Sequence, residues 1–302
     1  MCPVLASGGA VAGGLASPAV PIRTRSDRGL PGDRCGAMNL INFLLVFISF
    51  LLASGFVLYF FQDKFIFING EKLSKSEPYQ FAHTFEEVFI KTPNTNEINA
   101  LHFKQVQSKR VVLFCHGNYG NLLKWGHRVA YLLAYNYDVL VFDYRSYGKS
   151  TGNFNEDAMY TDAEAVYDYI KKQYKEEDIV VYGYSLGGTF ATRVASQNNP
   201  KELVLEAPFY NLKKAVRYYS RIAPTFLLKY AFRTDKDIVK VTAPITLFHG
   251  NQDRTTSCKQ SKDLLKLNTS NKNEYIEIDT ATHHNVRDFL IYKDKLKEIL
   301  AR

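Results

Sequence analysis

The feature that most constrains the fold is an alternation of short apolar runs and helical patterns along most of the chain. The apolar runs, rich in β-branched and aromatic residues, cover residues 111–115, 138–144, 179–184, 203–207, 244–250 and 275–278. Patterns with helical spacing cover residues 122–135, 157–173, 187–198, 259–267 and 287–300. This alternation predicts an α/β protein with a mainly parallel central sheet and helices on both faces. Because the runs are apolar almost throughout, both faces of the sheet should be covered.

Two earlier runs, around residues 85–91 and 98–103, could form an antiparallel start to the sheet. The predicted globular domain therefore extends over residues 80–302. No internal repeat suggests a solenoid.

The first part of the chain differs from this domain. Residues 1–37 are rich in Ala, Gly, Pro, Ser and Arg and contain no Lys, Asn, Tyr or Phe. Such a segment buries too little apolar surface to order itself, so we expect it to be disordered, a targeting segment or foreign to the mature chain. Met38 would be a plausible alternative start.

Residues 40–61 contain no charged side chain and are closed by Asp63 and Lys64. As a helix, this stretch would cross a hydrocarbon core of about 30 Å, which predicts a single membrane anchor. A cleaved signal peptide is the alternative, because Ala53, Ser54 and Gly55 are small, but the stretch is long for one.

The side of the membrane on which the domain lies follows from the flanking charges. Arginines at positions 23, 25, 28 and 34 precede the span, which favours a cytoplasmic N-terminus and an extracytoplasmic domain. If translation starts at Met38, these arginines are absent, and the lysines that follow the span favour the opposite orientation.

Charge and cysteine content narrow the function classes. The chain has 38 basic and 30 acidic residues, a net charge of +8, without the basic stripe and interleaved aromatic residues typical of nucleic-acid binding. The net charge fits either a solvated surface or attraction to an anionic membrane. The four cysteines form no CxxC or Cys/His zinc spacing.

The sequence from Gly183 to Gly187 reads G-Y-S-L-G, with Ser185 at its centre. It follows an apolar run and precedes a helical pattern, which is the context of a nucleophile elbow. The small flanking residues let the chain turn sharply, and the turn would raise the Ser185 hydroxyl above the edge of the sheet.

A nucleophilic serine needs a base, and the base needs an acid to orient it. Asp253 follows the run at 244–250, at the edge where parallel sheets form their active sites. His284 lies after the run at 275–278. We favour Asp253 and His284, with Glu206 as the alternative acid and His283 as the alternative base.

The oxyanion that forms when a serine attacks a carbonyl group needs two hydrogen-bond donors. The backbone N–H of Leu186 follows the serine directly. The loop after residue 115 supplies the second candidate, the backbone N–H of Asn118, beside Gly117. A plain glycine turn is the alternative interpretation of this loop.

Six short motifs follow one another along the chain. They are C-H-G-N-Y-G-N, F-D-Y-R-S-Y-G-K-S-T-G, Y-G-Y-S-L-G-G, L-E-A-P-F-Y-N-L, F-H-G-N-Q-D and H-H-N, at residues 115–121, 142–152, 182–188, 205–212, 248–253 and 283–285. Together they resemble the α/β-hydrolase superfamily, and in particular its single-pass, membrane-anchored serine hydrolases with a short cap. The resemblance covers about residues 80–300 and implies the α/β-hydrolase fold.

The resemblance implies a triad of Ser185, Asp253 and His284, with Asn118 and Leu186 as the oxyanion hole. It favours His284 because relatives place the catalytic histidine directly before an asparagine. The chain departs from the family at Ser146, where relatives have glycine, and at His283, where they have a small residue.

Residues 208–233 would form a cap over the catalytic edge. They combine basic residues with aromatic and aliphatic ones and contain no acid, which suits a membrane interface. The alternative is an amphipathic helix packed on the core with a solvated basic face.

The sequence therefore predicts a serine hydrolase that cleaves carboxylic esters of acyl or lipid-like compounds through an acyl-enzyme, without a metal or organic cofactor. The expected partners are the ester substrate and the membrane, not nucleic acid. A thioesterase or amide hydrolase acting on acylated proteins or peptides is the first alternative, and a non-catalytic membrane interaction module is the second. The sequence gives no indication of oligomeric state.

Overall fold

The computed structural model describes the backbone of residues 33–93 and 95–302 and the side chains from residue 38 on. The chain divides into two compact units: residues up to Leu52, and Ala53–Arg302. The expectation of disorder for residues 1–37 falls mostly outside the described residues, but from Asp33 on the segment already belongs to a helix.

Helix α1 begins at Asp33 and ends at Ile66. Its part from Met38 to Ile66 contains an 18-residue window with a mean hydropathy of 2.5 and is the candidate membrane span among the described residues. The helix therefore continues beyond the apolar stretch 40–61 through Asp63 and Lys64.

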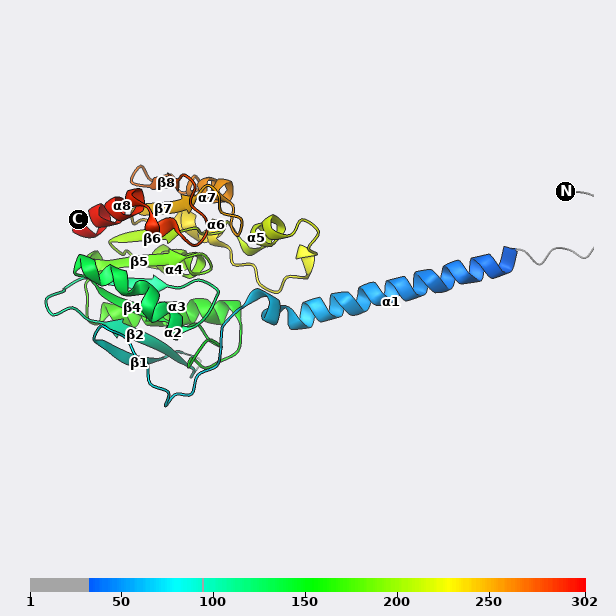
Figure 1. Cartoon of the computed structure of the whole chain (residues 1–302), viewed down its shortest axis with the longest axis horizontal. Coiled ribbons are helices and arrows are strands. Elements are labelled where there is room, and N and C mark those ends of the chain that lie inside the picture. Colours follow the sequence, from blue (N-terminus) through cyan, green and yellow to red (C-terminus); the bar gives the residue numbers. More distant parts are fainter. Residues whose placement is uncertain (1–32, 94) are drawn as a thin grey trace, which may run out of the picture. The chain divides into compact units, whose positions relative to one another are not determined.

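The second unit contains an eight-stranded sheet with the strand order β1-β2-β4-β3-β5-β6-β7-β8 (Figure 1). The strands are β1 (Phe85–Lys91), β2 (Glu97–Phe103), β3 (Val111–Cys115), β4 (Asp138–Phe142), β5 (Ile179–Tyr184), β6 (Glu202–Glu206), β7 (Ile245–Gly250) and β8 (Glu274–Ile278). Strands β3 to β8 are parallel, whereas β2 runs antiparallel to both β1 and β4. The predicted α/β sheet with an antiparallel start is confirmed.

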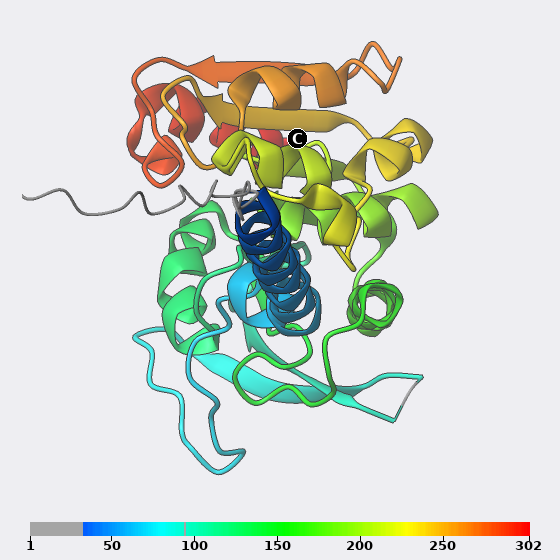
Figure 2. The same ribbon diagram turned by 90° about the vertical axis from the view of Figure 1, so that its right-hand side faces the viewer.

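Helices connect the strands and cover both faces of the sheet, as Figure 2 shows from a second direction. The helices after α1 are α2 (Leu122–Val129), α3 (Glu156–Lys171), α4 (Gly187–Gln197), α5 (Leu212–Tyr219), α6 (Thr234–Asp237), α7 (Cys258–Leu265) and α8 (Leu290–Ala301). Short 3₁₀ helices cover η1 (Ala130–Tyr135), η2 (Glu176–Asp178), η3 (Thr225–Leu227), η4 (Ile238–Lys240) and η5 (Val286–Asp288). Residues of α3, α4 and α7 belong to one buried cluster, and residues of α2 and α8 belong to the other.

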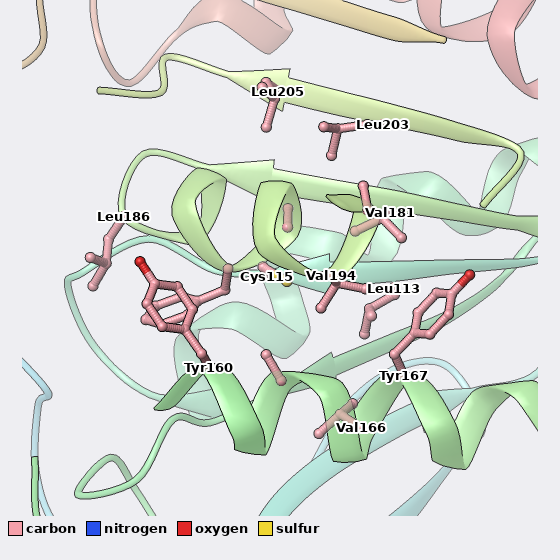
Figure 3. Packing of buried hydrophobic residues seen from close by; sticks show 14 of the residues in the cluster. Leu113, Cys115, Tyr160, Val166, Tyr167, Val181, Leu186, Val194, Leu203 and Leu205 are labelled. Atoms are coloured by element: carbon pink, nitrogen blue, oxygen red, sulfur yellow. The ribbon is translucent and has the colours of Figure 1, made fainter. Parts of the chain in front are cut away.

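The two clusters explain why the strands are apolar along their whole length. Successive residues of β3 and β5 belong to the two clusters in turn, because successive side chains of a strand point to opposite faces of the sheet. Figure 3 shows one of these faces, where Val166 of α3 and Val194 of α4 pack near Leu113 and Val181 of the sheet. Burial of these side chains on either face stabilises the fold by about 25 cal/mol per Å² of apolar surface removed from water.

The predicted element boundaries differ from the observed ones where the chain leaves the sheet. The run at 138–144 continues past the end of β4, and Tyr144 instead donates a hydrogen bond from its hydroxyl to the carbonyl oxygen of His116, at 2.6 Å. The helical pattern at 122–135 divides into α2 and the 3₁₀ helix η1. The loops after β3, β5, β7 and β8 leave the carboxyl edge of the sheet, where parallel sheets place their ligand sites.

Candidate active site

The turn between β5 and α4 holds Ser185 in the left-handed region, with φ of 52°. A non-glycine residue rarely adopts this conformation, so the surrounding structure must stabilise it. The Ser185 N–H donates to the carbonyl oxygen of Glu206 at 2.9 Å, and the Ser185 carbonyl oxygen accepts from Gly188 N–H at 2.9 Å. These two hydrogen bonds fix the turn on both sides of the serine.

Two glycines make room for this turn. A Cβ atom at Gly183 would lie 2.6 Å from the Cα of Gly188, and a Cβ at Gly187 would overlap the carbonyl oxygen of Cys115. The strand-to-helix turn can therefore close only if these positions carry no side chain. This is the local geometry that the G-x-S-x-G pattern predicts.

A chain of two hydrogen bonds joins Ser185 to His283 and Asp253. The Nε2 atom of His283 lies 3.0 Å from the Ser185 Oγ, and its Nδ1 lies 2.7 Å from the Asp253 Oδ2. Both His283 and Asp253 are buried, with 5% and 4% of their surfaces exposed. The structure thus brings the predicted serine and the predicted acid together through one histidine.

That histidine is not the one that the sequence favoured, and the expectation for His284 is corrected by these contacts. The Nδ1 of His284 instead lies 3.1 Å from the hydroxyl of Tyr184, and its ring lies edge-on against the ring of His283. Partial burial of the ring and the proximity of His283 and Arg128 lower the pKa of His284.

The turn after β8 decides which of the two histidines faces the serine. The side-chain Oδ1 of Asn285 accepts a hydrogen bond from the N–H of Thr282 at 2.7 Å and holds the turn. Gly250 approaches Ala281 so closely that a Cβ would overlap the Ala281 carbonyl oxygen, and the N–H of Gln252 donates to that oxygen at 3.0 Å. The resulting turn leaves one residue, His284, between the inward-facing histidine and the asparagine.

Asp253 is surrounded by donors. Its Oδ1 accepts from the N–H groups of Thr255 and Thr256 at 2.7 and 2.9 Å. Its Oδ2 accepts from the hydroxyl of Thr256 at 3.0 Å, and the Nε2 of His249 lies 3.1 Å away. Burial alone would raise the pKa of Asp253, but the hydrogen bonds from His249, His283 and Thr256 hold it well below its usual range.

Glu206, the alternative acid, has a different set of partners. Its buried Oε2 accepts hydrogen bonds from the hydroxyl of Tyr182 at 2.6 Å and from the Nε of Arg287 at 2.8 Å. Tyr182 also lies 2.9 Å from Tyr292, hydroxyl to hydroxyl. Glu206 thus belongs to a buried polar cluster that links β5 and β6 to η5 and α8.

The loop after β3 carries Asn118 next to the same space as Ser185. The Asn118 side chain is held by its neighbours: its Nδ2 donates to the carbonyl oxygen of Ile66 at 2.5 Å, and its Oδ1 accepts from the hydroxyl of Tyr147 at 2.8 Å. Over residues 33–93 and 95–302, the backbone N–H groups of Asn118 and Leu186 donate to no protein acceptor. Both residues line the same cavity as Ser185.

This cavity has a volume of about 520 Å³, within the range of small-molecule sites. Ser185, Asn118 and Thr256 supply polar atoms to its wall, and most other lining residues are apolar. Most of these apolar residues come from two regions of the second unit: the cap, including Leu212 and Val216 of α5, and the end of α1. In the part of the chain that the structure describes, no cluster of His, Cys, Asp and Glu has the arrangement of a metal site.

The chain belongs to the α/β-hydrolase family, whose fold the sheet order and the serine turn also define. Residues 110–237 match the family described as the α/β-hydrolase fold. An uncharacterised protein of Acanthamoeba polyphaga mimivirus is 30% identical over 239 residues, which cover 71% of this chain and 79% of that protein.

The chain is also similar to two proteins that are named as hydrolases. The lysophosphatidylserine lipase ABHD12 of Danio rerio is 29% identical, over 56% of this chain and 50% of its own length. The structure of an esterase from Pyrococcus furiosus has a TM-score of 0.64 and 21% identity, over 78% of this chain and 97% of that one. At this identity, the structural likeness shows the fold alone.

The sequence did not lead to three features of the site, or led to them only as an alternative. His283 was weighed and not preferred, although the order of residues allowed it. His249 and Thr256, which contact Asp253, lie four residues before it and three after it, so hydrogen-bonding residues around the predicted acid were a usable signal. The wall formed by the end of α1 had no local signal, because the apolar pattern there already fitted a membrane span.

Proposed function

We propose that this protein is a serine hydrolase that cleaves carboxylic esters with an acyl or lipid-like part. The observation that carries the proposal is the hydrogen-bonded series Ser185–His283–Asp253, which opens on an apolar cavity. Nothing in packing requires a serine in a strained turn, a histidine and a carboxylate in this order. Their combination is the arrangement that activates a serine hydroxyl.

The proposed reaction begins with proton transfer. Asp253 accepts the Nδ1–H of His283 and leaves the Nε2 lone pair facing the Ser185 hydroxyl. The Nε2 takes the hydroxyl proton while Oγ bonds to the ester carbonyl carbon, and the carbonyl electron pair moves to its oxygen. We assign the N–H groups of Asn118 and Leu186 as the donors that stabilise this oxyanion.

The intermediate then collapses. The bond from the carbonyl carbon to the alcohol oxygen breaks, and the alcohol leaves with the proton from His283 Nε2. A water molecule gives a proton to His283, attacks the acyl-enzyme and releases the acid, and Ser185 regains its proton. Every proton in this sequence moves through one imidazole, so no metal or organic cofactor is required.

The surroundings of the cavity support a lipid-like substrate. The lining of the cavity is mostly apolar. In the cap, 81%, 93% and 83% of the surfaces of Tyr219, Ile222 and Phe226 are exposed. Lys213, Lys214, Arg217, Arg221 and Lys229 are exposed in the same cap. Packing on the core accounts for the inward Leu212 and Val216 but not for the exposed aromatic and aliphatic side chains, which suit a membrane interface.

We place the protein in the membrane as a single-pass chain, with residues 40–61 as its anchor, residues 80–302 as the hydrolase domain and residues 208–233 as the cap. The arginines that precede the span favour an extracytoplasmic domain. Protease protection in sealed vesicles checks this orientation, and digestion of the domain from the cytoplasmic side would reverse it.

The proposed function is tested with the full chain in detergent micelles and a fluorophosphonate probe, which reacts with activated serines. The wild type should be labelled and should hydrolyse a butanoyl ester, and Ser185→Ala should lose both, by at least about a thousandfold in rate. Undiminished hydrolysis by Ser185→Ala would overturn the proposal. Matched oxygen ester and thioester substrates then identify the leaving group, and preference for the thioester would replace the assigned substrate class.

A further inference from the structure

We propose that the last turns of helix α1 form one wall of the acyl-chain pocket, so that the membrane anchor also selects the length of the acyl chain. The inference rests on the proposed ester hydrolysis. Leu58, Gln62, Phe65 and Ile66 of α1 line the same cavity as Ser185, together with residues of the cap. All of them belong to the unit that starts at Ala53.

Gln62 joins this wall to the cap. Its side chain is buried, with 5% of its surface exposed, although Asp63 and Lys64 follow at the end of the apolar stretch. Its Nε2 donates to the carbonyl oxygen of Leu227 at 3.0 Å, and its Oε1 accepts from the N–H of Lys229 at 2.8 Å. A buried amide that satisfies the backbone of the cap in this way fixes the distance between helix and cap.

A second contact lies one residue further along the helix. The hydroxyl of Tyr230 donates to the Asp63 carboxylate at 2.7 Å. The ammonium group of Lys229 lies 5.1 Å from the ring centre of Tyr59. The cap is thus connected to α1 by polar contacts on consecutive turns, which makes the helix a fixed part of the pocket.

The end of α1 is connected to the catalytic edge as well. Asn118, the assigned oxyanion residue, donates from Nδ2 to the carbonyl oxygen of Ile66 and accepts at Oδ1 from the N–H of Ile68 at 3.3 Å. The N–H of Gly120 donates to the Ile68 carbonyl oxygen at 2.9 Å. The pocket wall therefore starts beside the reacting carbonyl group.

From this point the wall follows the helix away from the catalytic edge. Leu58 lies eight residues before Ile66, which corresponds to about 12 Å along a helix that rises 1.5 Å per residue. Leu58 also belongs to the uncharged stretch 40–61. An acyl chain bound along this wall would run from Ser185 towards the level of the hydrocarbon core, in surroundings that are mostly apolar.

This arrangement identifies the substrate class as long-chain acyl esters taken from a membrane. The carbonyl group is bound at Ser185, and the end of the chain is bound near Leu58. The side chain at position 58 should then limit the length of the chain that fits.

The test compares Leu58→Trp with Val57→Trp in the full chain, reconstituted in lipid nanodiscs. Val57 is the preceding residue on the same helix, is 47% exposed and does not line the pocket. Leu58→Trp should lower kcat/KM for a palmitoyl ester at least about tenfold relative to a butanoyl ester, whereas Val57→Trp should leave the ratio within about twofold. Leu58→Ala should shift the preference towards longer chains.

The butanoyl ester serves as the folding control for all three variants. If Leu58→Trp lost this activity too, the chain-length preference of Leu58→Ala would decide, and an unchanged preference would overturn the inference. Equal ratios in Leu58→Trp and Val57→Trp, with butanoyl hydrolysis intact, would overturn the role of the helix and leave the proposed function standing. A wild type that hydrolyses no ester would instead overturn the proposed function.

Discussion

The carboxyl edge of the sheet and the wall formed by the cap and the end of α1 meet at one cavity but are built differently. At the sheet edge, Asp253 and His283 are almost fully buried and are held by hydrogen bonds from several loops. In the cap, Ile222 and Phe226 are almost fully exposed.

From this difference we infer that the two regions have different roles. The sheet edge fixes the groups that need sub-ångström placement for chemistry, and the wall determines which substrates reach them. Substitutions at the edge should change kcat for every ester, and substitutions in the wall should change the preference among esters.

Asp253→Asn should have the largest effect. An amide at this position no longer stabilises the imidazole tautomer that carries its proton on Nδ1. The Nε2 atom then has no lone pair available to accept the proton of Ser185. We expect kcat for a butanoyl ester to fall by about three to four orders of magnitude, with chain-length preference unchanged. Steady-state kinetics on the full chain check this, and a drop limited to palmitoyl esters would contradict the different roles of the two regions.

Arg287→Met should act on stability. It would leave the carboxylate of Glu206 buried without its ionic partner, which costs about 3–5 kcal/mol. The double variant Glu206→Gln/Arg287→Met removes the stranded charge and should recover most of the loss. Denaturant unfolding in micelles measures both, and equal destabilisation of single and double variants would contradict the assignment of Glu206 as one half of a buried pair.

The low pKa of Asp253 predicts a pH dependence of stability. Because the pKa is lower in the folded chain than in the unfolded one, the stabilisation is fully present above about pH 4, the ordinary value for Asp, and is lost as the pH falls below it. Thermal unfolding of wild type and Asp253→Asn between pH 3 and pH 7 should show a difference on the order of 2 kcal/mol that shrinks at the acid end. A difference that grows there would reverse the sign of the pKa shift.

The cap should give the smallest effect. Ile222→Ser combined with Phe226→Ser removes exposed apolar surface without touching the cavity lining. Hydrolysis of a palmitoyl ester in vesicles should fall about threefold to tenfold, and hydrolysis of a soluble butanoyl ester should stay unchanged. Val106→Ser, at an exposed apolar residue outside the cap, is the control. An equal loss of palmitoyl ester hydrolysis in Val106→Ser would contradict the proposed contact of the cap with the membrane.

The parts of the molecule that were predictable from sequence are those that local pattern determines. Strands β3 and β5 begin and end at the predicted residues, because continuous apolar runs bounded by turn residues identify buried strands. Ser185 was identifiable because its turn needs glycine at fixed positions on both sides.

The choice between His283 and His284 was not predictable in this way. The two histidines are the same residue type and follow β8 at almost the same distance along the chain. Which of them faces Ser185 depends on a turn that is held by Asn285 and by the close approach of Gly250 to Ala281. The wall was hidden for a similar reason, since Gln62 and Leu227 are 165 residues apart.

The most direct test of the proposed Ser185–His283–Asp253 site compares His283→Ala and His284→Ala, purified as full chains and assayed with a butanoyl ester and a fluorophosphonate probe. We expect His283→Ala to lower kcat at least about a thousandfold and to suppress labelling of Ser185, whereas His284→Ala should stay within about tenfold of wild type. The reverse result, an active His283→Ala and an inactive His284→Ala, would contradict the assignment of the base and with it the proposed site.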